Sequence, residues 1–168
     1  MNLQRIAFAL AASLLATAGV ASDFKLGGVV LLQPEEIVGA RVNSAADLAA
    51  YIRALESAAT GYFSTLEPPA PRAGHLVIAA KPEHATNAWV VFEPALSAEQ
   101  AEALVRRLRE VTPADTRDGV VVFALKVSID GAAPPHDHVP RIADWDKAIE
   151  KAGEALSVDD VVLRSWKP

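Results

Sequence analysis

The stretch that decides the fold is GVVVFALKVSI, residues 119–129. Every side chain from Val120 to Leu125 is apolar, so both faces of a strand built from this run need cover. From Lys126 onward polar and apolar residues alternate, which indicates that one face of the strand emerges into solvent there. The Asp-Gly pair at 130–131 is typical of a turn and ends the strand. The stretch therefore predicts the central strand of a sheet that is covered on two sides.

A hairpin and a helix are expected just before this strand. HLVIAAK at 75–81 and NAWVVFE at 87–93 are two β-rich runs joined by a short linker, which favours a β-hairpin. In the segment 97–111, Ser97 and Gln100 have the spacing of a capping box ahead of an apolar stripe. That pattern predicts a helix with a well-defined start.

The remaining elements follow from shorter patterns. Apolar residues recur at helical spacing after Ser44 up to Gly61, which predicts a second helix, and Trp145 and Ile149 share one side of a third. The other expected segments are strands at 28–32 and 37–42, a stiff proline connector at 67–72, the third helix at 144–156 and a closing strand at 161–166. This order suits an α+β or mixed α/β single domain, with an antiparallel or mixed sheet and about three helices packed on it.

The beginning of the chain has the pattern of a secretory signal peptide. Residues 1–24, MNLQRIAFALAASLLATAGVASDF, combine one positive charge at Arg5, an uncharged apolar run and small residues at its end. The apolar run is shorter than the roughly 20 residues of a membrane-spanning helix, so cleavage after Ala21 is favoured over a retained anchor. We therefore expect a signal peptide at 1–21, a globular domain at 22–168, and a bacterial periplasmic or secreted location.

Composition limits the chemistry of the exported product. The chain has no cysteine, which excludes a disulfide, a thiol nucleophile and a lipidated cysteine. Its formal net charge is −5, and cleavage would remove the positive charge of Arg5 and make the balance more acidic. An acidic protein is a poor general partner for nucleic acid or anionic lipid. We expect neither nucleic acid nor, after cleavage, a membrane among its partners.

A short loop carries the most distinctive polar residues. In PPHDHVP, residues 134–140, His136 and His138 flank Asp137, and prolines restrict the backbone on both sides. Alternate side chains of an extended backbone point the same way, so the two imidazoles can face one metal ion. The prolines also explain an exposed, extended loop that binds no metal, and we favour that interpretation.

The metal hypothesis needs further ligands, because a metal site requires three or four converging groups. Asp137 in the loop or Asp144 beyond it could add a carboxylate, and His84 at the hairpin turn or His75 at a strand start could be a third ligand. Sequence alone does not show that His84, His75 or Asp144 comes near the loop.

The sequence gives even less support for an enzyme or a cofactor site than for a metal site. The serines lack the G-x-S-x-G pattern of a nucleophile elbow, and the glycines lack the spacing of nucleotide-binding loops, so no cofactor is expected. Acids near the ends of the central strand are typical turn formers. The arginines of the 97–111 helix suit a solvated face, with a contact to an anion or a partner as the alternative; these arginines are Arg106, Arg107 and Arg109.

The carboxyl-terminal third resembles one known family. GVVVFALKVSIDG, the helix DWDKAIEKAGEAL and the ending RSWKP are similar to the carboxyl-terminal domain of TonB-type energy transducers. In that family a strand, a DG-type turn, a helix and a final strand occur in this order. The chain departs from the family by its cleavable leader, by the absence of a long proline-rich spacer, and by a proline–histidine loop where a hairpin strand should follow. No functional residue is carried over.

Three function classes remain open. The first is an exported binding or interaction protein without catalytic activity, an accessory or inhibitor-like module that contacts another envelope protein through His136, Asp137 and His138. The second is a metal-binding protein that uses His136, His138 and His84. The third is a small hydrolase, which would need acids and a histidine in one cleft. We favour the first.

Overall fold

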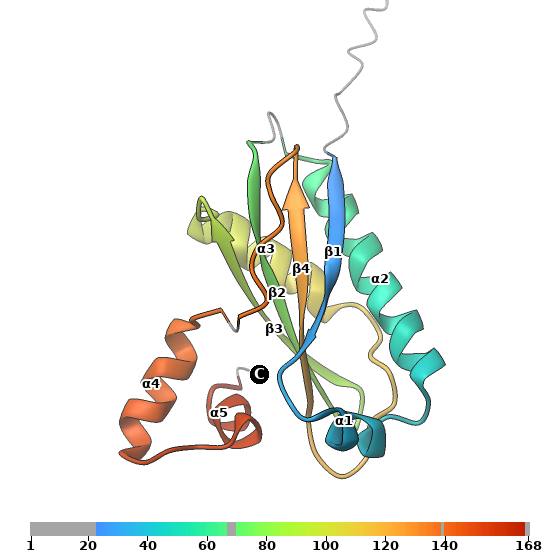
Figure 1. The fold of residues 1–168 in the computed structure, drawn as a ribbon, viewed down its shortest axis with the longest axis vertical. Coiled ribbons are helices and arrows are strands. Elements are labelled where there is room, and N and C mark those ends of the chain that lie inside the picture. Colours follow the sequence, from blue (N-terminus) through green and yellow to red (C-terminus); the bar gives the residue numbers. More distant parts are fainter. Residues whose placement is uncertain (1–22, 67–69, 139, 167–168) are drawn as a thin grey trace, which may run out of the picture.

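The structure is a computed structural model that describes residues 23–66, 70–138 and 140–166. It is a four-stranded antiparallel sheet in the order β1-β4-β2-β3, with helices on both faces (Figure 1). The strands are β1 (Phe24–Leu31), β2 (Arg72–Lys81), β3 (Ala85–Glu93) and β4 (Val121–Ile129). The helices are α1 (Glu35–Arg41), α2 (Ala45–Phe63), α3 (Ala98–Arg109), α4 (Ala143–Ala152) and α5 (Val158–Arg164).

The α+β class is confirmed, with five helices in the described ranges instead of about three. The predicted signal peptide at 1–21 and part of the proline connector, residues 67–69, lie outside the described residues. None of the helices in the ranges given above is long and apolar enough to cross a membrane.

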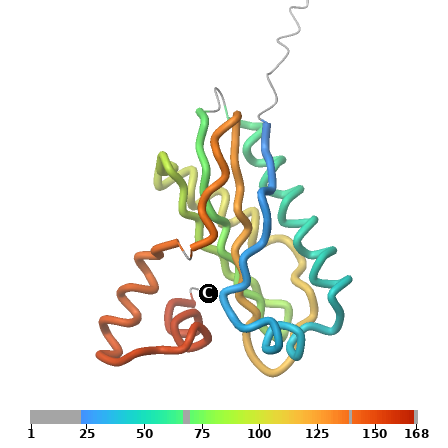
Figure 2. Tube along the Cα trace, in the orientation of Figure 1, coloured from blue at the N-terminus to red at the C-terminus, as the bar shows by residue number. Residues whose placement is uncertain are grey.

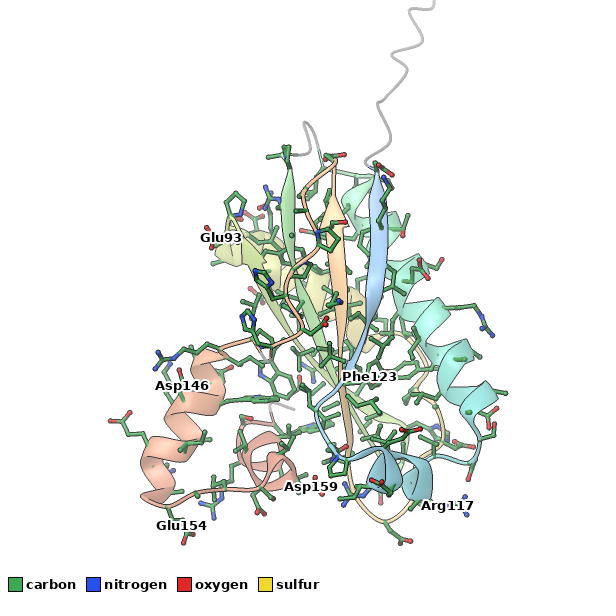
Figure 3. The ribbon with its side chains drawn as sticks, in the orientation of Figure 1. Glu93, Arg117, Phe123, Asp146, Glu154 and Asp159 are labelled. Carbon is green, nitrogen blue, oxygen red and sulfur yellow. The ribbon has the colours of Figure 1, made fainter. Side chains whose placement is uncertain are left out.

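β4 is one of the two inner strands of the sheet, in agreement with its sequence. It pairs with β1 on one side and β2 on the other, and the side chain of Phe123 at its middle is fully buried (Figure 3). The expected emergence into solvent near Lys126 is wrong, because Ser128, on the same face of the strand as Lys126, is buried. The reason is a long-range contact: the segment after β4 turns back and runs along the sheet, covering this end of the strand (Figure 2).

The two faces of the sheet have separate apolar cores. On one face α2 and α3 pack over a cluster that includes Leu55, Phe63, Leu104 and Phe123. On the other face α4 and α5 cover a second cluster, in which Trp89, Val122, Trp145 and Val162 are buried. The returning segment covers the rest of that second face, so helices and loop share one layer (Figure 1).

The helices α2 and α3 begin where their sequences predict. The Ser44 side chain accepts a hydrogen bond from the Asp47 amide at the start of α2, and Ser97 and Gln100 form a complete capping box at α3. α2 continues past Gly61 to Phe63. In the third predicted helix, α4, Trp145 is buried but Ile149 is 42% exposed, and Ala148 takes the inner position instead.

Two predicted strands are helices. The segment 37–42 falls largely within α1, which has Glu35 and Glu36 in its first turn and Arg41 in its last, an arrangement that suits the helix dipole. The segment 161–166 falls largely within α5, which Ser157 caps through the Asp160 amide. β-Branched residues misled the sequence interpretation at both places. The likeness to TonB-type transducers therefore fails at its last element, the final strand.

An ion pair joins α1 to α5 at the end of the sheet. Arg41 lies 2.7 Å from Asp159, and Gln33 donates a hydrogen bond of 2.6 Å to the same carboxylate. Both Arg41 and Gln33 also donate to the carbonyl of Val120 beside β4. Burial raises the pKa of Asp159, but the hydrogen bonds from Arg41 and Gln33 lower it more, so the net pKa lies below its ordinary value of 3.8.

This depressed pKa makes a pH-dependent prediction. A carboxyl group with a lower pKa in the folded state stabilises the fold above its unfolded pKa, and that contribution is lost as pH falls through the folded pKa. We expect Asp159→Asn to lower the free energy of unfolding by about 1–2 kcal/mol at pH 7. The deficit should shrink below about pH 4. Urea melts from pH 7 to pH 3 measure it, with Asp23→Asn in an exposed ion pair as the control. A deficit that stays constant with pH would contradict the assignment.

Candidate functional site

The returning segment is fastened to the sheet at two points. His75 of β2 is buried, and its Nε2 donates a hydrogen bond of 3.1 Å to the carbonyl of His136. One residue further on, Asp137 forms an ion pair and hydrogen bond with Lys126 of β4. Both contacts use side chains on the same face of the sheet, so the loop is held in a defined position.

The structure brings three of the histidines together. His136, Asp137 and His138 are exposed, as the sequence predicts for this loop. The rings of His136 and His138 are stacked with centroids 5.8 Å apart, and the His75 ring lies 6.5 Å from that of His138.

His84 does not join this cluster. It lies beyond the far end of β2, about 20 Å of strand from His75, and its Nδ1 is 3.3 Å from Asp115. In the part of the chain that the structure describes, no three histidine or acidic residues are arranged to hold a metal ion. The metal alternative built on His84 with His136 and His138 therefore fails on distance.

The charge states of His75 and Asp137 suit residues that hold the loop in position. Burial lowers the pKa of His75, and the hydrogen bond to the His136 carbonyl opposes that shift only in part. His75 is therefore neutral at pH 7 with its proton on Nε2, the atom that faces the carbonyl. The hydrogen bond from Lys126 lowers the pKa of Asp137, which stays ionised. The polar contacts of His75 and Asp137 hold the loop in place on the sheet.

A groove lies between this loop and β3. Its volume is about 390 Å³, and its walls come from the ends of β2 and β3 and from the loop. The residues that line it are Ala73, Gly74, His75, Val91, Phe92, Glu93, Pro134, Pro135, His136, His138, Pro140 and Arg141.

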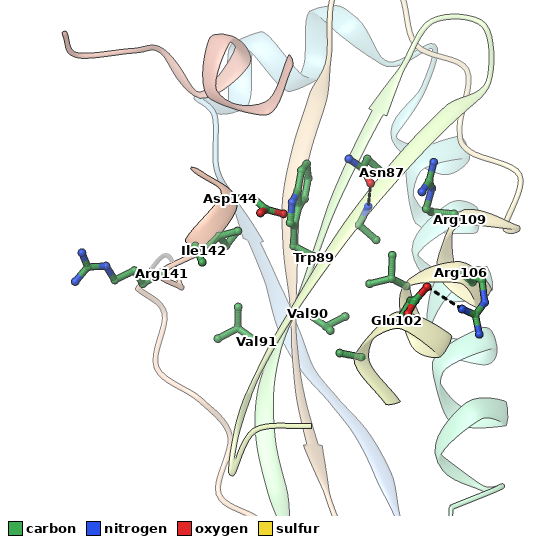
Figure 4. A pocket seen from close by; sticks show the side chains of 14 residues that line it. Asn87, Trp89, Val90, Val91, Glu102, Arg106, Arg109, Arg141, Ile142 and Asp144 are labelled. Atoms are coloured by element: carbon green, nitrogen blue, oxygen red, sulfur yellow. Dashed lines mark hydrogen bonds and ion pairs between the residues drawn. The ribbon is translucent and has the colours of Figure 1, made fainter. Parts of the chain in front are cut away.

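A larger groove of about 720 Å³ continues along β3 (Figure 4). β3 forms its floor, α3 forms one wall, and the chain entering α4 forms the other. The residues that line it are Asn87, Ala88, Trp89, Val90, Val91, Ala101, Glu102, Val105, Arg106, Arg109, Arg141, Ile142, Ala143 and Asp144. Both grooves include Val91 and Arg141, so they form one continuous surface, which we name the β3 groove.

The floor of the β3 groove is an edge strand. β3 pairs with β2 on one side, and in the described residues no strand of the sheet pairs with its other side. The Ala88 amide donates to the Oδ1 of Asn87, at 3.0 Å, so this amide points away from β2. Backbone groups alternate in direction along a strand, so the N–H and C=O of Val90 point to the same free side.

The sequence interpretation missed this surface. It assigned the hairpin correctly but had no information on strand order, so the edge position of β3 was not visible. The usable signal was in NAWVVFE, a strand without charge before its last residue. The arginines singled out on the 97–111 helix do contribute, since Arg106 and Arg109 line the β3 groove.

Comparisons with models of protein families, with curated proteins and with solved structures gave no match to this chain.

Proposed function

We propose that the chain is an exported binding protein without catalytic activity, which contacts another protein of the cell envelope through the β3 groove and the loop at 136–138. The observation that carries this proposal is the continuity of the two grooves at Val91 and Arg141. A partner lying along β3 would meet the exposed side chains of His136 and His138 at the end of its path.

The make-up of the surface suits protein recognition. The floor of the groove consists of apolar side chains of β3 that are buried or half-buried. Trp89 and Val91 lie on one face of the strand and Val90 lies on the other. Charged side chains stand at its rim, where Arg106 pairs with Glu102 and Arg141 pairs with Asp146. An apolar centre with a polar rim is the usual anatomy of a protein interface. The rigid elements on both sides keep the ordering cost of binding low.

The loop is the part of this surface that sequence analysis also selects, and replacing it tests the function. We expect the triple variant His136→Ala, Asp137→Ala, His138→Ala to melt at nearly the temperature of the unchanged chain, because the three side chains are exposed and the hydrogen bond from His75 to the backbone carbonyl of residue 136 is kept. Capture from an extract of the native envelope, read by mass spectrometry, should retain a specific protein with the unchanged chain and lose most of it with the variant.

A matched control is the double variant His84→Ala, Asp115→Ala. It removes an exposed histidine–aspartate pair at the other end of the hairpin, outside the β3 groove. The control should retain the partner. Capture of the same proteins by all three forms, or of none by the unchanged chain, would contradict the proposed function.

A further inference from the structure

We propose that the β3 groove binds its partner by strand addition: an extended segment that carries acidic side chains pairs with the free edge of β3. This inference rests on the proposed function and specifies its chemistry. An extended peptide that joins a sheet edge gains affinity from main-chain hydrogen bonds and specificity from alternate side chains.

The first observation is that β3 is an unprotected edge. Natural edge strands are blunted by charged residues, prolines or bulges that discourage further pairing. β1, the other edge, has Lys25 and a register shift between Leu26 and Gly28. β3 has no charged residue or proline from Ala85 to Phe92, and its pairing with β2 is regular throughout. A regular uncharged edge suits pairing with another strand.

The second observation is an unpaired donor at this edge. Asn87 is only 3% exposed and lines the β3 groove, yet its Nδ2 has no hydrogen-bond partner among the described residues. Its Oδ1 meanwhile accepts from the outward Ala88 amide (Figure 4). A buried unpaired amide is costly and calls for an acceptor. The carbonyl of an added strand would supply one.

The shape of the groove selects a single strand over a folded partner. α3 stands on one side of the edge and the chain at 141–144 on the other (Figure 4). Residues 87–91 line the floor, which is about 16 Å of strand. An extended segment fits between such walls, whereas the edge of a second copy would have to bring the same two walls with it. A second copy is therefore disfavoured as the occupant.

The charge at the rim indicates acidic side chains on that segment. In the larger part of the β3 groove, between α3 and residues 141–144, three arginines stand against two acids, Arg106, Arg109 and Arg141 against Glu102 and Asp144, while Glu93 lines the smaller part. The balance in the larger part is positive, although the whole chain has a formal net charge of −5. Complementary charge steers encounters and sets register more than it adds affinity.

A defined peptide tests the pairing directly. The probe is a nine-residue peptide in which glutamate alternates with valine, and its counterpart has lysine in place of glutamate. We expect the glutamate peptide to bind at least tenfold more tightly in isothermal titration at low salt, with a smaller ratio at high salt because exposed charges are screened. Equal binding of the two peptides, or tighter binding of the lysine peptide, would overturn the acidic preference.

Val90→Pro tests the edge itself. Proline removes the outward amide and places its ring in the path of an added strand, while the Val90 amide makes no bond to β2. The glutamate peptide should bind at least tenfold more weakly to this variant. Val90→Thr, which keeps the amide and the branched shape, should bind within about twofold of the unchanged chain.

A second measurement does not depend on how the proline variant folds. N-methylation of alternate peptide residues blocks hydrogen bonds on one edge of the peptide only, so one set of methylated positions should abolish binding and the other should not. Equal loss with both sets, or with neither, would overturn strand addition.

Charge variants locate the contact. Arg106→Gln with Arg141→Gln should remove most of the preference for glutamate over lysine. Arg53→Gln, at an exposed position of α2 that does not line the groove, should leave the preference intact. If the double variant still preferred the glutamate peptide to the same degree, Arg106 and Arg141 would not be the residues that select acidic side chains.

Failure of this inference can be told apart from failure of the proposed function. If an envelope protein is lost with the triple alanine variant but retained by Val90→Pro, strand addition is wrong and the binding function stands. If the unchanged chain captures no partner and binds neither peptide, both proposals are wrong.

Discussion

Replacing Gly74 with alanine should lower the melting temperature by roughly 10 °C or more. Gly74 lies in β2 opposite Phe92 of β3. A Cβ at this position would lie 2.2 Å from the carbonyl oxygen of Val91 and 2.8 Å from the Cα of Phe92. These are backbone atoms, so no side-chain rotation relieves the contact. We expect a loss of about 4 kcal/mol, above the 1–3 kcal/mol of ordinary overpacking.

The matched control is Gly39→Ala in α1. No heavy atom lies within 4 Å of a Cβ built at Gly39, and alanine favours a helix over glycine by roughly 0.5–1 kcal/mol. This variant should melt at the same temperature or slightly higher. Thermal melts followed by circular dichroism compare the two. If Gly74→Ala melted within about 2 °C of the unchanged protein, the close approach of β2 to β3 would be wrong.

The second large effect is expected at Phe123, at the centre of β4. Its side chain is fully buried, and its ring meets that of Tyr51 edge-on with centroids 6.1 Å apart. Phe123→Ala would leave a cavity between the sheet and α2 and should cost about 3–5 kcal/mol. In urea denaturation, this loss of stability should appear as a lower midpoint concentration of urea, while the dependence of the unfolding free energy on urea concentration stays similar.

Leu163→Ala is the control for that loss. Leu163 is 50% exposed on α5, so its truncation removes little buried area and should cost less than about 1 kcal/mol. Equal losses at Phe123 and Leu163 would contradict the inner position of β4.

Local patterns predicted the elements whose determinants are local. The uninterrupted apolar run of β4 identified an inner strand, and the Ser97–Gln100 spacing identified the start of α3. In α5 the sequence contains two opposing local signals, and the stronger one was missed. The Ser157 cap and the acids of the first turn, Asp159 and Asp160, favour a helix more strongly than the β-branched residues of this segment favour a strand. An N-terminal cap and a favourable helix dipole together stabilise a helix by about 1–2 kcal/mol, which is enough to make a short segment a helix and not a strand.

Long-range packing accounts for the remaining misses. Nothing near Lys126 shows that residues eleven positions later return to cover it, because that cover depends on a hydrogen bond from His75 in another strand. The loop at 136–138 was selected from composition alone, and its attachment to the sheet was not foreseen. The edge position of β3 depends on strand order, which a single sequence does not specify.

Amide hydrogen exchange along β3, followed by NMR, tests the central claim most directly. In the free protein we expect the Val90 amide to exchange at least tenfold faster than the amides of Trp89 and Val91, since it points to the open edge while theirs point to β2. Saturation with the glutamate–valine peptide should slow exchange at Val90 to the level of its neighbours. A Val90 amide that is already protected in the free protein, or that stays fast when the peptide is bound, would contradict strand addition at β3.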